Sequence, residues 1–304
     1  MEKIPLNLRE TIKQVVKDHL EKENGLVMGQ CLTAVGWVGG TLPEIYEDGG
    51  MVELSMADVS NGGIAVGAAL SGRKTMYVIR YQGFNWFNAP IIVNYACKSK
   101  EIWNRPCPLF VRSIAMEGGI GPVAGSSHHS IYYRMPGIKI YSPMSPSEYK
   151  LTYRDFMQGD DVFYVSEHRG SYDNCDDLTD IFYDNPHFVL FPISITRFNA
   201  IEASNALIKE GIRVSVSHIF IIKPFAPSSV SIDNLASSTY GGCVIDDDYP
   251  DGISKSLAND LSNLTGSRVE TLGLEDRSAG FAKAVDNMPP DVNRIISKVR
   301  DAIK

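Results

Sequence analysis

The 304-residue sequence predicts an α/β protein with a mostly parallel sheet, followed by a second, smaller α/β unit. Short apolar runs with strand character alternate with longer segments of helical periodicity, which is the pattern of repeated strand–helix–strand units. A glycine- and alanine-rich helix follows one of these strands, and polar residues follow several others. In such sheets ligands bind beyond the carboxyl ends of the strands, so these residues are the first candidates for a functional site.

Composition and charge are those of an ordinary enzyme. The chain is 44% hydrophobic and 21% charged, and its net charge of −7 argues against a nucleic-acid surface. No apolar run approaches the roughly 18–20 residues that span a bilayer, and the N-terminus lacks a signal-peptide core. The five cysteines are odd in number with no Cys-x-x-Cys, which suits reduced thiols. We therefore expect a soluble, cytoplasmic protein with no nucleic-acid and no membrane partner.

The first unit is expected to begin with an amphipathic helix. Ile12, Val15, Val16 and Leu20 stand at helical spacing, and Asn24-Gly25 ends the pattern. Apolar runs and turn residues predict the elements that follow, with a glycine-rich loop over 29–40 and further loops over 81–90 and 116–130. The predicted strands are 26–28, 51–54, 75–80, 108–112, 137–143 and 161–166, and the helices are 9–23, 58–69, 91–98 and 145–157.

An acidic stretch with Asn185-Pro186 and no clean period predicts a linker over 175–192. The expected organisation is therefore a domain over 1–174, the linker, and a domain over 193–304. In the second domain the predicted strands are 193–196, 214–222, 242–248 and 269–272, and the helices are 200–210, 254–264 and 292–303.

The helix after the second strand is the centre of the first domain. Asp58 stands where the strand over 51–54 gives way to the helix, and small residues leave that helix almost no side-chain bulk. Glycine is costly inside a helix, so several together indicate close packing of another backbone or a flat ligand. Asp58 itself has two interpretations: an N-cap that accepts a backbone N–H, or a group with a chemical role.

Further candidates follow other predicted strands. Tyr81, Phe84, Trp86 and Phe87 are either core or a stacking wall for a flat heterocycle. His128-His129 lie on the loop over 116–130, and Ser166-Glu-His-Arg169 end the last strand of the block. The carboxyl ends of parallel strands gather at one sheet edge, so we expect these residues to converge.

These segments, with Met135-Pro-Gly-Ile-Lys-Ile-Tyr-Ser-Pro143, resemble the pyrimidine-binding half of thiamine diphosphate enzymes. That half is the C-terminal part of transketolase and the beta subunit of 2-oxoacid dehydrogenase E1. The resemblance covers nearly the whole chain, because Val244–Gly252 and Leu272–Ala302 resemble the family's C-terminal domain. It implies a parallel-sheet pyrimidine-binding domain plus a smaller transketolase C-terminal-like domain. No stretch resembles the half that carries the diphosphate and magnesium motif.

The resemblance implies roles for three kinds of residue. Asp58 matches the family's acid, usually Glu, that hydrogen-bonds the pyrimidine N1′ and favours the imino tautomer. Phe84 and Phe87 match the aromatics that stack on the aminopyrimidine, with Trp86 between them and Gln82 on the same loop. We expect all five to bind the cofactor, with core packing as the alternative for the aromatics.

The histidine loop departs from the family's pattern. The family's catalytic histidine would fall near Ala124, and His128 and His129 come a few residues later. They are candidates for catalysis and substrate binding, since histidine titrates near neutrality, and loop polar contacts are the alternative. No ligand spacing around them indicates a metal. Ser166-Glu-His-Arg169 lie where transketolases place a Ser/Arg pair that holds a substrate phosphate. We expect His168 and Arg169 to bind substrate, and an exposed, solvated arginine is the alternative.

Three functions are compatible with these residues. The first is the beta-type subunit of a split transketolase that transfers a two-carbon ketol or acyl-anion unit between sugar-type small molecules. The second is the beta subunit of a 2-oxoacid dehydrogenase or decarboxylase. The third is a catalytically silent regulatory or binding subunit. The first two imply thiamine diphosphate, Mg²⁺ ligated by a separate alpha-type subunit, and a homodimer of this chain within an α2β2 assembly.

Overall fold

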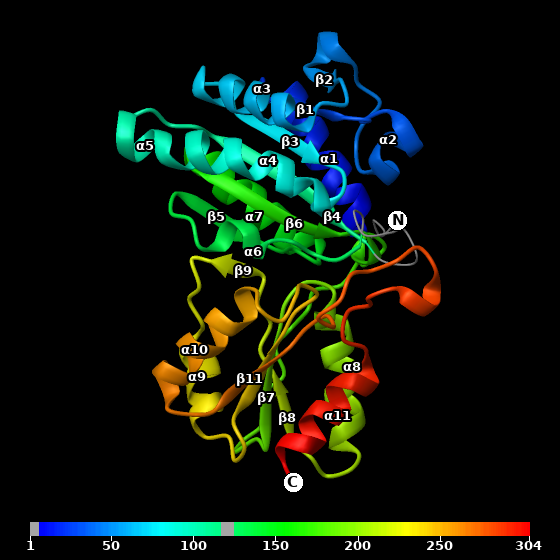
Figure 1. Cartoon of the computed structure of the whole chain (residues 1–304), viewed down its shortest axis with the longest axis vertical. Coiled ribbons are helices and arrows are strands. Elements are labelled where there is room, and N and C mark those ends of the chain that lie inside the picture. The colour runs from blue at the N-terminus through cyan, green and yellow to red at the C-terminus, as the bar shows by residue number, and fades with distance from the viewer. Residues whose placement is uncertain (1–5, 117–124) are drawn as a thin grey trace, which may run out of the picture. The chain divides into compact units, whose positions relative to one another are not determined.

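The computed structural model describes residues 6–116 and 125–304. The chain forms two compact units (Figure 1), and their described parts are residues 6–116 with 127–177, and 178–304 with Gly125 and Ser126. Among the described residues no helix is both long and apolar enough to cross a membrane.

Parallel strands form the sheet of the first unit. Their order is β2-β1-β3-β4-β6-β5, and each neighbouring pair is parallel. The strands are β1 (Leu26–Gln30), β2 (Met51–Leu54), β3 (Thr75–Ile79), β4 (Leu109–Ala115), β5 (Ile138–Tyr141) and β6 (Val162–His168). Every residue of β3, β4 and β6 is buried, which explains their continuous apolar runs in place of an alternating pattern.

Helices cover both faces of this sheet (Figure 1). Helices α3 and α4 pack against each other on one face, and α1 packs with α7 on the other. The helices are α1 (Leu8–Glu21), α2 (Ala34–Gly40), α3 (Asp58–Leu70), α4 (Asn85–Ile91), α5 (Cys97–Trp103), α6 (Ser130–Tyr133) and α7 (Pro146–Gln158). Short turns are η1 (Glu47–Gly49), η2 (Gln82–Phe84), η4 (Arg169–Ser171) and the π-helical η3 (Ile92–Ala96).

Local sequence signals set the ends of these helices. Asn7 caps α1 by accepting a hydrogen bond from the Glu10 amide. Ser145 caps α7 in the same way through the Glu148 amide. The Glu148 carboxylate accepts in turn from the Met144 amide, so the start of α7 is held from both sides. Gly137 precedes β5 with φ +74°, and a Cβ there would lie 1.9 Å from the Cys97 carbonyl oxygen, so only glycine fits.

Two segments that the sequence analysis assigned to loops are helical. Over 29–40 the structure forms α2, in which Gly36 to Gly40 all have positive φ. Glycine adopts this left-handed conformation without steric clash at three of the five positions, while Trp37 and Val38 adopt it at a steric cost. Over 81–90 the aromatic segment forms η2 and α4, and Pro90 lies inside that helix.

The second unit contains a four-stranded parallel sheet in the order β11-β10-β7-β8. Helices α8 and α11 pack together beside it, as do α9 and α10 on the other side (Figure 1). The strands of this unit are β7 (Phe188–Pro192), β8 (Val214–Val216), β9 (Ile221–Lys223), β10 (Gly242–Ile245) and β11 (Val269–Leu272). The helices are α8 (Thr196–Ile208), α9 (Ser229–Ala236), α10 (Ile253–Thr265) and α11 (Val292–Ala302), with the turn η5 (Lys283–Val285).

The first strand of this unit lies earlier than expected. The sequence analysis extended the linker to 192 and began a strand at 193, whereas β7 already occupies Phe188–Pro192 and pairs with β8 and β10. The predicted strand over 214–222 divides into β8 and β9, and α9 was not anticipated. Phe188, Leu190, Val214 and Val216 pack with α8 and α11 in the core of this unit.

Candidate functional site

The predicted site residues of the first unit lie at the carboxyl edge of its sheet. Gln82 follows β3 and His168 ends β6, and Gln30, which was not predicted, ends β1 at the same edge. Hydrogen bonds join several of them: the Gln82 amide reaches the Ser166 hydroxyl, and His129 reaches the same hydroxyl. The expected convergence at one sheet edge is therefore present, as it should be for loops that leave parallel strands.

Asp58 does not act as an N-cap. It is the first residue of α3, and the capping position belongs to Ala57, which has no side-chain capping bond. The half-buried carboxylate instead accepts hydrogen bonds from two amide side chains, Gln30 Nε2 at 2.9 Å and Asn88 Nδ2 at 3.1 Å. Both donate to the same oxygen, Oδ1. The described residues make no hydrogen bond to Oδ2, so one carboxylate oxygen is held and the other is available.

The aromatics of the predicted wall differ in their surroundings. Trp86 and Phe87 on α4 are 64% and 54% exposed, so neither belongs to the core of the described chain. Phe84 is half-buried, and its ring centroid lies 5.9 Å from that of Tyr81. The Phe84 carbonyl accepts a hydrogen bond from Asn88 Nδ2, which ties the aromatic segment to the side chain that also holds Asp58.

Gln82 lies inside the protein rather than on an open wall. Its Nε2 donates to the Ser166 hydroxyl at 2.8 Å and to the Ser113 carbonyl at 3.2 Å. Its Oε1 accepts from the His128 amide at 2.6 Å and from the Tyr164 hydroxyl at 3.0 Å. With no exposed surface and both amide atoms engaged, Gln82 positions the start of the histidine segment, and these bonds favour that role over direct cofactor contact.

The two histidines are buried at the carboxyl edge. Burial, reinforced by the neighbouring His129, lowers the pKa of His128 to about 4, so its ring is neutral at pH 7. The His128 ring meets Trp86 edge to face, with centroids 6.3 Å apart. His129 Nδ1 lies 3.2 Å from the Ser166 hydroxyl. Ala124, the position at which the family's histidine would fall, lies outside the described residues.

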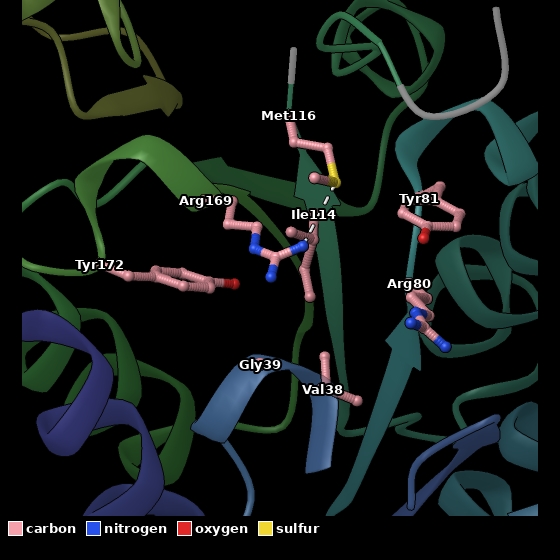
Figure 2. A pocket seen from close by; sticks show the side chains of 8 residues that line it. All are labelled: Val38, Gly39, Arg80, Tyr81, Ile114, Met116, Arg169 and Tyr172. Atoms are coloured by element: carbon pink, nitrogen blue, oxygen red, sulfur yellow. Dashed lines mark hydrogen bonds between the residues drawn. The ribbon is translucent and has the colours of Figure 1, made fainter. Parts of the chain in front are cut away.

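His168 and Arg169 have different environments. His168 is buried, and its Nδ1 accepts a hydrogen bond from the Gly170 amide at 3.1 Å, so it shapes the turn η4. Arg169 is exposed and lines a small, open pocket (Figure 2). The pocket residues are Val38, Gly39, Arg80, Tyr81, Ile114, Met116, Arg169 and Tyr172.

This pocket presents cationic groups on an apolar lining. Figure 2 shows the Arg169 guanidinium beside Met116, 3.8 Å from its sulfur, and Arg80 beside Tyr81 on the other side. The Arg80 guanidinium lies 5.5 Å from the centroid of the Tyr81 ring. Guanidinium groups bind phosphate and carboxylate bidentately, so the pocket is suited to an anionic end of a small molecule.

A buried ion pair fixes the end of β6 from which Arg169 emerges. Arg112 of β4 donates to both oxygens of Glu167, at 2.6 and 2.9 Å. Tyr149 and Tyr172 donate to the same carboxylate, so its charge is well compensated inside the protein. Because Tyr172 also lines the pocket, this network joins the core to the pocket wall.

Sequence reasoning missed three residues of this site. Gln30 and Asn88 bond to Asp58 from β1 and α4, and Arg80 lines the pocket. Arg80 is the last residue of the predicted strand over 75–80 and directly follows β3, so the strand-end rule could have found it. Asn88 is 30 residues from Asp58 and Gln30 is 28 residues from it, so no local pattern connects them.

Comparisons with known proteins agree with this architecture. Residues 5–174 match the family described as transketolase, pyrimidine binding domain. The 2-oxoisovalerate dehydrogenase subunit beta of Bacillus subtilis is 23% identical over 80% of each chain. The pyruvate dehydrogenase E1 component subunit beta of Chaetosphaeridium globosum is 20% identical over 98% of each.

Solved structures share the fold at low sequence identity. A split gene transketolase, described as an inactive beta4 tetramer, superposes with a TM-score of 0.71 at 14% identity over 99% of each chain. A transketolase from Campylobacter jejuni gives a TM-score of 0.74 at 14% identity, covering 98% of this chain and 47% of that one. Since the family match spans more than half of the sequence, the chain belongs to the transketolase pyrimidine-binding domain family.

Proposed function

We propose that the chain is the pyrimidine-binding, beta-type subunit of a split thiamine diphosphate-dependent enzyme of transketolase type. It would transfer a two-carbon ketol or acyl-anion unit between sugar-type substrates. The observation that carries this proposal is Asp58, with Oδ1 held by two amides and Oδ2 available; one of these amides, Asn88, belongs to α4, the helix that carries the exposed Trp86 and Phe87.

The residues present fit an aminopyrimidine. Asp58 Oδ2 offers a hydrogen-bond acceptor to a ring nitrogen, and Trp86 and Phe87 offer aromatic surface for stacking. When bound, thiamine diphosphate supplies the carbon nucleophile and the electron sink that break a bond beside a carbonyl. The protein supplies position, charge and exclusion of water. Mg²⁺ and the diphosphate would be held by the partner subunit.

The surface of the α3–α5 layer supports the need for a partner. Gly63 and Gly67 on α3 have open space where a Cβ would stand. The exposed apolar residues of this layer are Met56, Val59, Ile64, Trp86, Phe87, Tyr95, Ile102 and Trp103. Large apolar side chains left exposed on neighbouring helices are typical of a protein interface, which supports association with an alpha-type subunit in an α2β2 assembly.

The identity of the donor separates two versions of this function. The pocket lined by Arg80 and Arg169 (the arginine pocket), together with His128 and His129, favours a hydroxylated, anionic substrate and ketol transfer. The relatives from Bacillus subtilis and Chaetosphaeridium globosum are beta subunits of 2-oxoacid dehydrogenases, which favours a 2-oxoacid donor that loses CO₂. A silent subunit is the third possibility, since aspartate stands where the family usually has glutamate.

Titration of thiamine diphosphate and Mg²⁺ tests the proposal. Heat or circular dichroism is followed for the chain alone and with a candidate diphosphate-binding partner. Binding only in the presence of the partner, followed by aldehyde-dependent turnover of a ketose phosphate without CO₂ release, supports ketol transfer. CO₂ release from a 2-oxoacid supports the dehydrogenase version.

Asp58→Ala should abolish turnover while the chain stays folded. Absence of cofactor binding with any partner would leave the silent subunit as the better interpretation.

A further inference from the structure

The carboxylate of Asp58 is held asymmetrically by Gln30 and Asn88. Two amide donors from different elements, β1 and α4, meet at its Oδ1, at 2.9 and 3.1 Å. Hydrogen bonds to an ionised acceptor are among the stronger ones in proteins, and two of them fix the plane of the carboxylate. A short aspartate side chain is thereby given one orientation, with Oδ2 as the oxygen left for a ligand.

The Asn88 side chain, which is the donor from α4, is itself oriented by a residue of the sheet. Tyr77 of β3 donates its hydroxyl proton to Asn88 Oδ1 at 2.7 Å, so the Asn88 amide nitrogen must face Asp58 and the Phe84 carbonyl. Burial and the nearby Asp58 charge raise the pKa of Tyr77 well above its ordinary range, so the hydroxyl keeps its proton. The chain of contacts therefore runs from the sheet through Tyr77 and Asn88 to Asp58.

Gln30 makes its contact at a cost to the protein. Its side chain is only 6% exposed, yet among the described residues its Oε1 has no hydrogen-bond partner. A buried polar atom without a partner destabilises a fold, and an apolar side chain of the same size would avoid that cost. Rotating the amide would turn Oε1 toward the carboxylate, so the charge on Asp58 dictates the observed orientation. Stability does not explain a glutamine at this position, whereas holding Asp58 does.

We propose that Gln30, together with Asn88, is a positioning residue for Asp58 that fixes Oδ2 toward an aminopyrimidine ligand. This inference rests on the proposed function. It adds Gln30 and Asn88 to the residues already proposed to bind the cofactor, which are Asp58 and the aromatics of 81–90. It predicts an unusual separation of effects: loss of Gln30 should weaken binding of the cofactor without weakening the fold.

The test compares Gln30→Met with a matched surface variant. Gln14→Met removes an amide that also donates to an aspartate at 2.9 Å, Asp18, on the exposed side of α1. For each variant, urea unfolding of the chain is measured first. Thiamine diphosphate and Mg²⁺ are then titrated into the chain with its diphosphate-binding partner. Tyr77→Phe is measured in the same way as a second variant.

Gln30→Met is expected to unfold at the same or a higher urea concentration than the wild type, and to bind the cofactor roughly tenfold or more weakly. Tyr77→Phe should weaken binding in the same direction, and Gln14→Met should leave binding unchanged. Unchanged binding by Gln30→Met, where the wild type binds, would overturn the positioning role while leaving the proposed function standing. Marked destabilisation of Gln30→Met would also overturn it, because the glutamine would then be structural. A wild type that binds no cofactor with any partner would refute both.

Discussion

Gly62 of α3 faces Asn88 of α4 so closely that a Cβ at position 62 would lie 3.1 Å from Asn88 Oδ1. The close approach of these two helices brings the Asn88 amide to the Asp58 carboxylate. One glycine of the small-residue helix is therefore explained by the packing of another element, as its composition indicated. Gly63, the next residue, has open space around its Cβ position.

Alanine substitutions at these two positions should have different effects on stability. Gly63→Ala is expected to raise the free energy of unfolding by about 1 kcal/mol, because alanine favours a helix and meets no neighbour. Gly62→Ala should gain less or lose stability, since its methyl group crowds the Asn88 carboxamide. Urea unfolding of the two variants measures this difference, and equal gains at both positions would contradict the proposed close packing.

His19 should make the protein less stable in mild acid. Burial lowers the pKa of this histidine from 6.5 to about 4 in the folded state. Between these two values the unfolded chain binds more protons than the folded one, so stability increases with pH across the window and is lost as pH falls from about 6.5 toward 4. The loss attributable to this residue is about 3 kcal/mol at most.

Urea unfolding at several pH values measures this dependence. His19→Gln should flatten the slope between pH 6.5 and 4, because glutamine does not titrate and still has a donor for the Lys74 carbonyl. His128 and His218, whose pKa values are also lowered by burial, keep some slope of the same sign. A slope in the variant equal to that of the wild type would assign the effect to those residues and contradict the role of His19.

The order of elements could be predicted from the sequence, because it depends on local periodicity. The predicted strands and helices of the first domain correspond to β1–β6, α1, α3 and α7, with shifts of a few residues at their ends. The helix predicted over 91–98 coincides with the π-helical η3, between α4 and α5. The loop prediction over 29–40 failed because glycine breaks a right-handed helix, whereas α2 contains a left-handed turn that glycine favours. β7 was missed because its apolar run is short and lies between Pro186 and Pro192, so the segment was assigned to a linker. Its pairing with β8 and β10 is not visible in the sequence.

The candidate site could be predicted in outline and not in its supporting contacts. Asp58, the histidines and Arg169 were singled out as candidates because each follows a predicted strand or lies in a segment that resembles the family. Gln82 was placed on the cofactor side, yet its amide is buried in a network with Ser166 and Tyr164. Such networks depend on side chains more than 80 residues apart in sequence, and no periodic pattern encodes them.

Removing His128 should impair turnover more than cofactor binding. Its ring is neutral at pH 7 and lies beside Trp86, so it can hold a substrate hydroxyl in place by a hydrogen bond, while the lowered pKa of about 4 makes it a weak base. His128→Ala is expected to lower kcat by about 10²-fold or more while the dissociation constant of thiamine diphosphate changes little. His129→Ala, and Ser166→Ala through its contact with His129, should give smaller losses of the same kind. A variant that loses cofactor affinity but keeps kcat would place His128 on the cofactor side instead.

The arginine pocket should determine affinity for the charged end of the substrate. Arg169 and Arg80 line the pocket from the segments that follow β6 and β3, and no catalytic contact is assigned to either (Figure 2). Arg169→Ala and Arg80→Ala should each raise KM for a phosphorylated or carboxylate donor by roughly 10- to 100-fold, with little change in cofactor binding. Arg169→Lys should recover part of the loss, because a lysine keeps the charge without the bidentate geometry. The same variants assayed with an uncharged analogue of the donor provide the control: KM for that analogue should not change. An equal rise in KM for charged and uncharged donors would show that the arginines shape the pocket wall and do not recognise an anion.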